Sequence, residues 1–276
     1  MREQRFIVVM AAILLVLPGA RAFCEDAQRF VLEDYELSFR KADDEGGYWA
    51  ELKRAGRVLV EVEPGACFMS DPVGVVADKP ARGCASLVGY CFSGGAHCCT
   101  TGILLTVCPS RRDVKTLSLA HSGAFQWEDA DGDGIDELVV PDWSFAYYAV
   151  NPDDPEDLFL PFAFSPAFRR LLVWDEEGWR VDRPGEFAEI YGALRKEAVE
   201  EAQRASAQRD PEGSVGPALS AAYYAFMGGR GEDAVREILK KYLPPDWREF
   251  SGSIRKDLRS SVEGFDPFET ERPRSP

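Results

Sequence analysis

Short runs of alternating apolar and polar residues fill the first two thirds of the chain, separated by turns rich in glycine and aspartate. A period of two is typical of half-buried β-strands, and short strands at this spacing favour an antiparallel meander. We therefore expect a β-rich domain over residues 23–182, arranged as a meander or in a propeller-like way. The predicted strands cover residues 31–39, 48–52, 58–62, 100–107, 114–119, 124–127, 138–140, 171–174 and 179–181.

After Pro184 the apolar residues change to steps of three and four, as at Phe187, Ile190 and Leu194. This period predicts amphipathic helices, and we expect about four of them in a small subdomain over residues 183–262. Residues 204–216 are predicted to be a loop, and Asp246 is predicted to cap the last helix. The tail, residues 263–276, is proline-rich and charged, so we expect it to be disordered. The expected fold class is thus α+β.

The first 22 residues have the features of a secretory signal peptide. Arg2 and Arg5 precede an unbroken apolar run over residues 6–17, and Ala20 and Ala22 flank a predicted cleavage site. Cleavage there would make Phe23 the first mature residue; an uncleaved anchor is the alternative. No other stretch is long and apolar enough to span a bilayer. We therefore expect a secreted or periplasmic protein with no membrane association after cleavage.

Seven cysteines lie in this β-rich part of the chain or just before it. Disulfides are the default in an oxidising compartment, and an odd number leaves at least one cysteine over, for which we favour Cys24. Residues 84–108 hold five cysteines and are predicted to form a glycine-rich loop held by disulfides. Two alternatives within that loop use His97: a zinc or copper site with nearby thiolates, or a histidine–thiol nucleophile pair with Cys99 or a distant thiol.

The formal net charge of the chain is −15. Nucleic acids and anionic membrane surfaces are bound by clusters of Lys and Arg, so we expect neither as a partner. An aromatic stretch at residues 142–148 precedes an acidic loop, and it could form a glycan-binding platform. Such stretches are more often part of a sheet core, which is the interpretation we favour.

Five carboxylates fall within nine residues in the segment 129–137. Like charges this close repel one another unless a cation lies among them. Carboxylates at positions one, three and five of the segment, a carbonyl at seven and an acid at nine can converge on Ca²⁺, and Gly134 at position six allows the sharp turn. A solvated acidic hairpin turn is the simpler alternative, because Asp-Gly occurs here twice.

The segment Asp-x-Asp-Gly-Asp-Gly-x-x-Glu-Leu-x-Val resembles the calcium loop of FG-GAP and VCBS-type repeats, in which a β-hairpin carries the ion. Its first half is also similar to an EF-hand loop, but an EF-hand needs a bidentate Glu at position twelve, which here is Val140. The resemblance implies one calcium ion bound by the side chains of Asp129, Asp131, Asp133 and Glu137 and by the carbonyl of Ile135. It also implies that Asp136 points elsewhere.

These observations favour a secreted, non-enzymatic calcium-binding module in which the ion is mainly structural and whose partner is an unknown protein or glycan. The whole chain has two histidines, so few residues are available for histidine-based catalysis. One alternative is a metal-assisted hydrolase that uses Asp136, Glu137 and Asp142 around the ion. Another is a periplasmic partner or inhibitor protein that acts through the Cys-rich loop. Asp142 is also a candidate outer partner of the ion.

Overall fold

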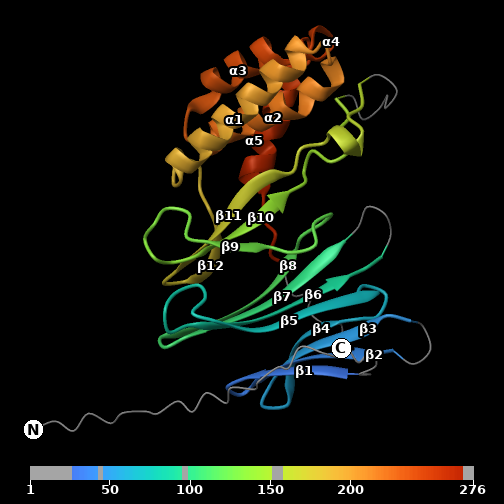
Figure 1. The fold of residues 1–276 in the computed structure, drawn as a ribbon, viewed down its shortest axis with the longest axis vertical. Coiled ribbons are helices and arrows are strands. Elements are labelled where there is room, and N and C mark those ends of the chain that lie inside the picture. The colour runs from blue at the N-terminus through green and yellow to red at the C-terminus, as the bar shows by residue number, and fades with distance from the viewer. Residues whose placement is uncertain (1–26, 43–45, 95–98, 151–157, 270–276) are drawn as a thin grey trace, which may run out of the picture.

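The computed structural model describes residues 27–42, 46–94, 99–150 and 158–269 (Figure 1). Over these residues the β-rich part forms three antiparallel sheets of four strands each, every one a simple meander. We call them the first, second and third sheet in chain order. Their strands are β1 (Ala27–Leu32), β2 (Tyr35–Lys41), β3 (Tyr48–Arg54) and β4 (Arg57–Val62); β5 (Met69–Ala77), β6 (Ala85–Phe92), β7 (Thr100–Cys108) and β8 (Arg111–Ser118); and β9 (Gln126–Glu128), β10 (Glu137–Asp142), β11 (Phe168–Asp175) and β12 (Gly178–Val181).

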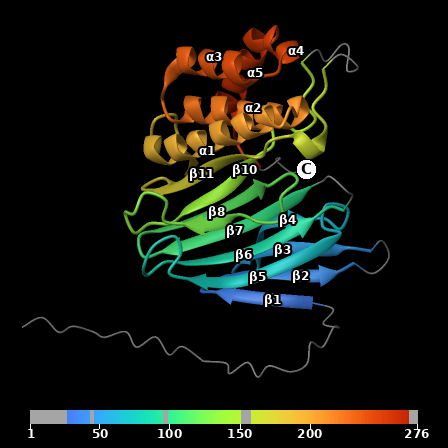
Figure 2. The ribbon, with the colours of Figure 1, turned by 45° about the horizontal axis from the view of Figure 1, so that its top comes forward.

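The sheets lie one above another and the helices close the stack at one end (Figures 1 and 2). Each interface is a separate hydrophobic core. Leu37 and Leu87 belong to the core between the first and second sheets, and Val88 and Leu172 to the core between the second and third. Adjacent residues of β6 therefore point into different cores, as the pleat of a strand requires. The middle sheet is buried on both faces.

The helical part contains the elements α1 (Ala188–Ala207), α2 (Pro211–Met227), α3 (Gly231–Tyr242), α4 (Pro245–Arg248) and α5 (Ser251–Gly264), and a short 3-10 turn η1 (Phe162–Phe164) precedes β11. Apolar side chains of α1, α2, α3 and α5 form one core with the outer face of the third sheet. The α+β fold class, with antiparallel sheets followed by a helical subdomain, is thus confirmed.

The helix boundaries differ from the predicted ones in two places. Residues 204–216 are not a loop, because α1 runs to Ala207 and α2 begins at Pro211. The carboxylate of Asp210 accepts the amide hydrogen of Gly213 (2.9 Å), and a proline fits the first position of a helix, so the polar stretch is a helix start. Asp246 is not an N-cap; it lies in the first turn of α4, and α5 follows separately.

The prediction of a glycine-rich loop between Cys84 and Cys108 was wrong. This segment contains β6 and all of the adjacent β7, whose side chains are nearly all buried in the two sheet cores. Two disulfides hold it, Cys67–Cys91 and Cys84–Cys108. Cys99 is also disulfide-bonded. The expectation of disulfides is confirmed, whereas Cys24 and the signal segment 1–22 lie outside the described residues.

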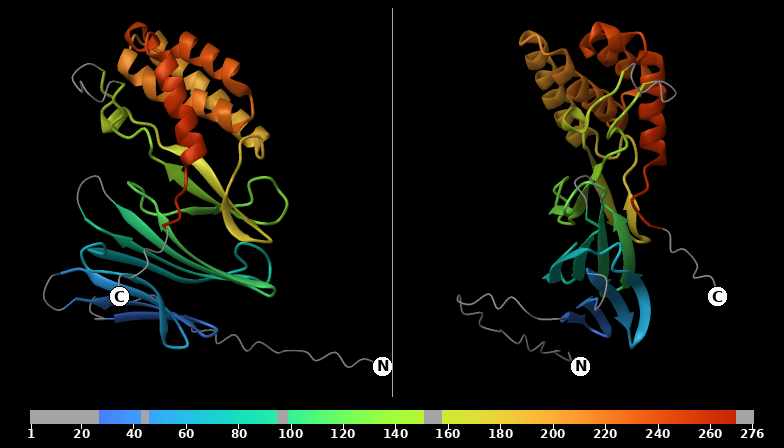
Figure 3. Two further views of the ribbon diagram at one scale, coloured as in Figure 1. Left: turned by 180° about the vertical axis from the view of Figure 1, so that it is seen from behind. Right: turned by 90° about the vertical axis from the view of Figure 1, so that its right-hand side faces the viewer.

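The segment after α5 also differs from the expectation of disorder from residue 263. Helix α5 continues to Gly264, and the next residues extend away from the helices to the edge of the second sheet (Figure 3). There Phe268 pairs with Leu117 of β8, and the amide of Ser118 donates to the carbonyl of Pro267 (2.8 Å). Apolar Phe265 and Phe268 pack against the core between the second and third sheets. Residues 270–276 lie outside the described part of the chain.

Candidate metal centre

The acidic segment is the connection between β9 and β10 in the third sheet. Glu128 and Glu137 form the first cross-strand pair of this hairpin, so the loop proper comprises residues 129–136. Its far side is attached to the second sheet. The ammonium of Lys79 lies 2.5 Å from a carboxylate oxygen of Asp136, and the amide of Asp136 donates to the carbonyl of Pro80 (2.7 Å). Asp136 therefore points away from the loop centre, as predicted.

The carboxylates of Asp129, Asp131 and Asp133 lie together at the exposed side of this loop. Each offers one oxygen, and the three oxygens lie within 4.8 Å of one another. The same carboxylates shape the turn: Asp129 accepts the amides of Gly132 (2.9 Å) and Gly134 (3.2 Å). Gly134 has a positive φ of 87°, which a glycine adopts without strain. Among the ion pairs of the described residues, none involves these three aspartates.

Glu137 lies at the base of the loop and is 2% exposed. One of its carboxylate oxygens accepts the amide hydrogen of Ala130 (2.9 Å). Burial raises the pKa of Glu137, the Ala130 amide lowers it, and the nearby charges of Asp131 and Asp133 raise it, with a net value of about 7. The amide of Ile135 donates to Asp133 (2.7 Å), which bends the loop between the exposed aspartates and Glu137.

This arrangement fits a hard divalent cation better than a transition metal. The converging groups are all carboxylate oxygens, which are the ligands that Ca²⁺ and Mg²⁺ prefer. Among the described residues, the group of possible ligands at the loop contains the three aspartates and neither sulfur nor imidazole. Cys67, Cys84, Cys91 and Cys108 are joined in disulfides. Residues 95–98, which include His97, lie outside the described residues. The thiol of Cys99, one candidate for a histidine–thiol pair, is in a disulfide.

Asp142, the third carboxylate in the proposed hydrolase site, does not lie near the acidic loop. Asp142 ends β10, five residues after Glu137, or roughly 17 Å along an extended strand. It accepts hydrogen bonds from the hydroxyls of Tyr223 (2.6 Å) and Ser261 (3.1 Å) and from the amide of Ser144 (2.8 Å). Asp142 is therefore part of the helix–sheet interface, and the suggestion that it is an outer partner of the ion was wrong.

The aromatic stretch at residues 142–148 divides between core and surface. Phe145 is buried in the core beneath the helices and stacks on Tyr148, with ring centroids 4.3 Å apart. Trp143 stacks on Phe162 instead, and His121 touches both rings with its edge. The expected core role thus holds for Phe145. The rings stack on one another, and no described contact shows an open sugar-binding face.

A buried polar network centred on Arg170 was not foreseen from the sequence. Its guanidinium is 1% exposed, donates to the carboxylate of Asp182 (2.8 Å) and to the hydroxyl of Tyr223 (3.0 Å), and lies over the ring of Phe265 (4.5 Å). The hydroxyl of Tyr191 also donates to Asp182. A charged residue inside the apolar run of β11 is the one signal that could have indicated it, because a buried cation requires an anion nearby.

Comparison with known proteins adds little to this geometry. The chain is 31% identical over 121 residues to an uncharacterized protein of Sinorhizobium fredii (strain NBRC 101917 / NGR234), y4bJ. The match includes 42% of this chain but 18% of that protein, so the chain spans much less than two thirds of the relative's length. No protein-family model and no solved structure matches.

Proposed function

We propose that the protein is an exported calcium-binding module in which one Ca²⁺ is structural and fixes the β9–β10 hairpin. The observation that carries this proposal is the convergence of Asp129, Asp131 and Asp133, whose oxygens lie within 4.8 Å of one another without an ion-paired cation among the described residues. The three carboxylates are exposed, so water weakens their repulsion to about 1 kcal/mol for each pair of unit charges about 4 Å apart, and the three pairs add. A divalent cation at their centre removes that repulsion.

The full ligand set in this proposal adds the carboxylate of Glu137 and the carbonyl of Ile135. Without an ion, burial raises the pKa of Glu137 to about 7, so in this proposal Ca²⁺ displaces the proton and lowers that pKa when it binds the carboxylate. The loop joins two antiparallel strands, which supports the resemblance to FG-GAP and VCBS-type loops over an EF-hand, whose loop joins helices. Val140 lies at position twelve, where an EF-hand has a bidentate glutamate, so we expect only modest affinity for Ca²⁺.

The proposed location outside the cytoplasm has support from the cysteines. Structural disulfides persist in oxidising compartments, and the four cysteines of Cys67–Cys91 and Cys84–Cys108 are all buried. Among the described residues, no helix combines the length and the apolar character that crossing a bilayer demands. The signal segment 1–22 completes the proposal of a secreted or periplasmic protein.

We propose a structural ion rather than a hydrolytic one because the remaining acids are already engaged. Asp136 is paired with Lys79, and Asp142 is hydrogen-bonded within the helix–sheet interface. A hydrolase needs a free acid or base within reach of the metal-bound water or substrate. The described contacts give neither residue that freedom.

Calcium titration followed by thermal melting tests the proposal. In wild-type protein, Ca²⁺ at a hundred times its dissociation constant is expected to add about 2.7 kcal/mol of stability, and EGTA should remove it. Asp131→Ala should abolish the calcium-dependent shift in melting temperature. Asp175→Asn is the matched control, because Asp175 makes the same kind of turn contact in the β11–β12 hairpin, to the amide of Glu177 (2.7 Å). A wild-type protein whose melting ignores both Ca²⁺ and EGTA would refute the structural ion.

A second candidate, a partner-binding protein, has one specific observation in its favour. Phe68, Met69, Val73 and Val75 are each about half exposed, and they lie on or next to β5, the outer strand of the second sheet. Exposed apolar side chains near one another are typical of protein contacts. A partner bound here should slow amide hydrogen exchange in β5 and leave the calcium-dependent melting shift unchanged. Val73→Ser with Val75→Ser should remove that protection.

A further inference from the structure

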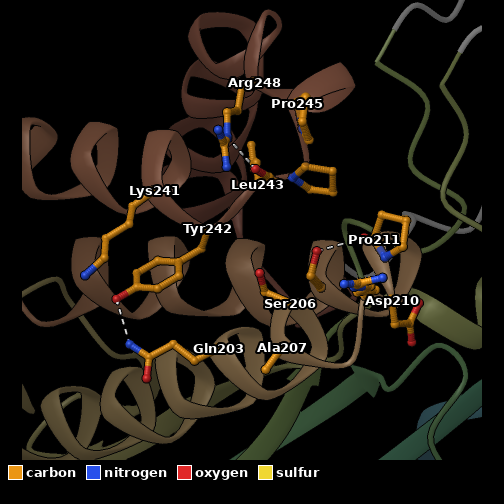
Figure 4. A pocket seen from close by; sticks show the side chains of 13 residues that line it. Gln203, Ser206, Ala207, Asp210, Pro211, Lys241, Tyr242, Leu243, Pro245 and Arg248 are labelled. Carbon is orange, nitrogen blue, oxygen red and sulfur yellow. Dashed lines mark hydrogen bonds between the residues drawn. The ribbon is translucent and has the colours of Figure 1, made fainter.

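A polar cleft opens in the helical subdomain, where the end of α1 and the start of α2 face the junction between α3 and α4 (Figure 4). Its volume is about 570 Å³, which is in the range of sites for small organic ligands. Ala207 at the end of α1, and Leu243 and Pro244 at the facing junction, give it apolar lining on both sides. The cleft lies in a different part of the molecule from the acidic loop, and the charged residues in its lining are mainly positive rather than negative.

Three cations line the cleft: Arg209, Lys241 and Arg248. In the part of the chain that the structure describes, none of them is ion-paired with a carboxylate, although the protein carries a net charge of −15. The Nε of Arg248 donates to the carbonyl of Leu243 (2.6 Å), and this bond orients the guanidinium at the cleft (Figure 4). Its terminal nitrogens make no described hydrogen bond.

The one acid in the lining does not neutralise these cations. The carboxylate of Asp210 accepts the amide of Gly213 (2.9 Å) and so is engaged by the first turn of α2. The N-terminus of α2 is therefore capped by the chain itself and is not the anion site. On the opposite wall, the hydroxyl of Tyr242 accepts a hydrogen bond from Gln203 (3.2 Å), and the ammonium of Lys241 lies 4.9 Å from the Tyr242 ring centroid. These contacts fix the aromatic wall beside the positive charge.

Arg209 occupies an unusual backbone position for its residue type. It follows the end of α1 with φ of +59°, a conformation that glycine adopts at this point of most helices. An arginine there is strained, whereas a glycine would not be. In exchange for this strain, the chain has a long cationic side chain in the lining of the cleft, where a glycine would have no side chain.

We propose that this cleft binds a small organic anion, a phosphate or carboxylate group held by Arg209 and Arg248 with its apolar body against Tyr242 and Pro244. Guanidinium groups bind both kinds of oxyanion through paired N–H donors. Lys241 adds a third positive charge at the rim. The proposal does not depend on calcium binding, because no residue of the cleft belongs to the β9–β10 loop.

Titration of the calcium-saturated protein with three probes, inorganic phosphate, phenyl phosphate and benzoate, followed by amide NMR shifts and calorimetry, tests the proposal. We expect saturable binding of phenyl phosphate or benzoate with shifts at residues 206–211 and 241–248, and weaker binding of inorganic phosphate. Tighter binding of phenyl phosphate than of benzoate would indicate a phosphate ligand, and the opposite order would indicate a carboxylate ligand. Absence of saturable binding by all three probes would overturn the proposal.

Two variants distinguish binding at the cleft from nonspecific electrostatic attraction of an anion to the positive side chains nearby. Arg209→Gly should weaken binding by about tenfold or more and at the same time raise the melting temperature, because it removes the backbone strain. Arg248→Gln should weaken binding similarly. The matched controls are Arg204→Ala and Lys240→Ala, which remove one cation each from neighbouring positions outside the cleft lining. Equal weakening by variants and controls would contradict the assignment.

Discussion

The two ends of β10 each bury a carboxylate, and comparing them shows two ways of compensating a buried negative charge. Glu137 begins the strand and Asp142 ends it, and both are 2% exposed. Asp142 receives three hydrogen bonds, from the hydroxyls of Tyr223 and Ser261 and the amide of Ser144. Glu137 has one described donor, the amide of Ala130, and two neighbouring aspartates whose charges raise its pKa.

The end at Asp142 is linked to a cation of the protein itself through one tyrosine. Tyr223 donates to Asp142 and accepts from Arg170, which is paired in turn with Asp182. This chain of contacts joins β10 and β11 to α2, so it fixes the helices on the third sheet. The end at Glu137 has no such internal cation among the described ion pairs. What differs is therefore the source of the positive charge: an arginine at one end and, in our proposal, a solvent ion at the other.

The largest expected effect is at the arginine end. Arg170→Met leaves Asp182 buried without its cation, and we expect a loss of about 3–5 kcal/mol in the free energy of unfolding, measured by urea denaturation. The control Arg112→Met breaks an exposed pair with Glu33 and should leave the urea midpoint almost unchanged.

The double variant Arg170→Met, Asp182→Leu sharpens this test. Removing both charges leaves no uncompensated ion, so it should recover part of the loss. Calcium should stabilise Arg170→Met by the same increment as wild type, because the two ends of the strand are distant sites that act independently. A calcium increment that disappears in Arg170→Met would mean that the two ends are one coupled unit.

The next effect is at Glu137 and depends on pH. Its pKa in the folded protein, about 7, lies above the ordinary value of 4.5, so the folded state binds the proton more tightly. In calcium-free buffer, this residue's contribution to stability is complete below pH 4.5 and is lost as the pH rises through 7. Glu137→Gln keeps an acceptor for the Ala130 amide without the charge. It should be more stable than wild type by about 3 kcal/mol at pH 8 and equal to it below pH 4.5.

Saturating Ca²⁺ should narrow that difference at pH 8, because an ionised carboxylate binds the cation more strongly than the neutral amide oxygen of Gln does. Glu128→Gln is the control, since Glu128 is the cross-strand partner of Glu137 but its side chain is exposed. Urea midpoints between pH 4 and 8, with EGTA or Ca²⁺, give both comparisons. A pH dependence shared by Glu137→Gln and wild type would remove Glu137 as the source.

The same contrast explains how much the sequence could predict. Strands with one solvated face, such as β3, alternate and were found. β6 was missed because both its faces are buried and its residues therefore show no alternation. β5 was missed because Pro72 and Gly74 interrupt it at an irregular pairing. Burial on both faces erases the pattern on which strand prediction depends.

The candidate site divides in the same way. The three aspartates are two residues apart, so a tight turn alone brings them together, and local spacing was sufficient. The burial of Glu137 could not be foreseen, because it depends on the packing of sheets formed from distant residues. The Arg170 network joins β11 to Asp182, Tyr223 and the carbonyl of Val262, up to 92 positions away. No local pattern encodes such a contact.

The smallest expected effect concerns the contact that ties the loop to the second sheet. Asp136→Asn removes its ion pair with Lys79, a partly exposed pair, so the free energy of unfolding should fall by about 1 kcal/mol or less. Because the side chain of Asp136 points away from the three aspartates, the variant should keep the calcium-dependent shift in melting temperature that Asp131→Ala loses. Lys79→Met should match it. If Asp136→Asn instead lost the shift while Lys79→Met kept it, Asp136 would be a ligand, and the division of the loop into ion-binding and anchoring carboxylates would be incorrect.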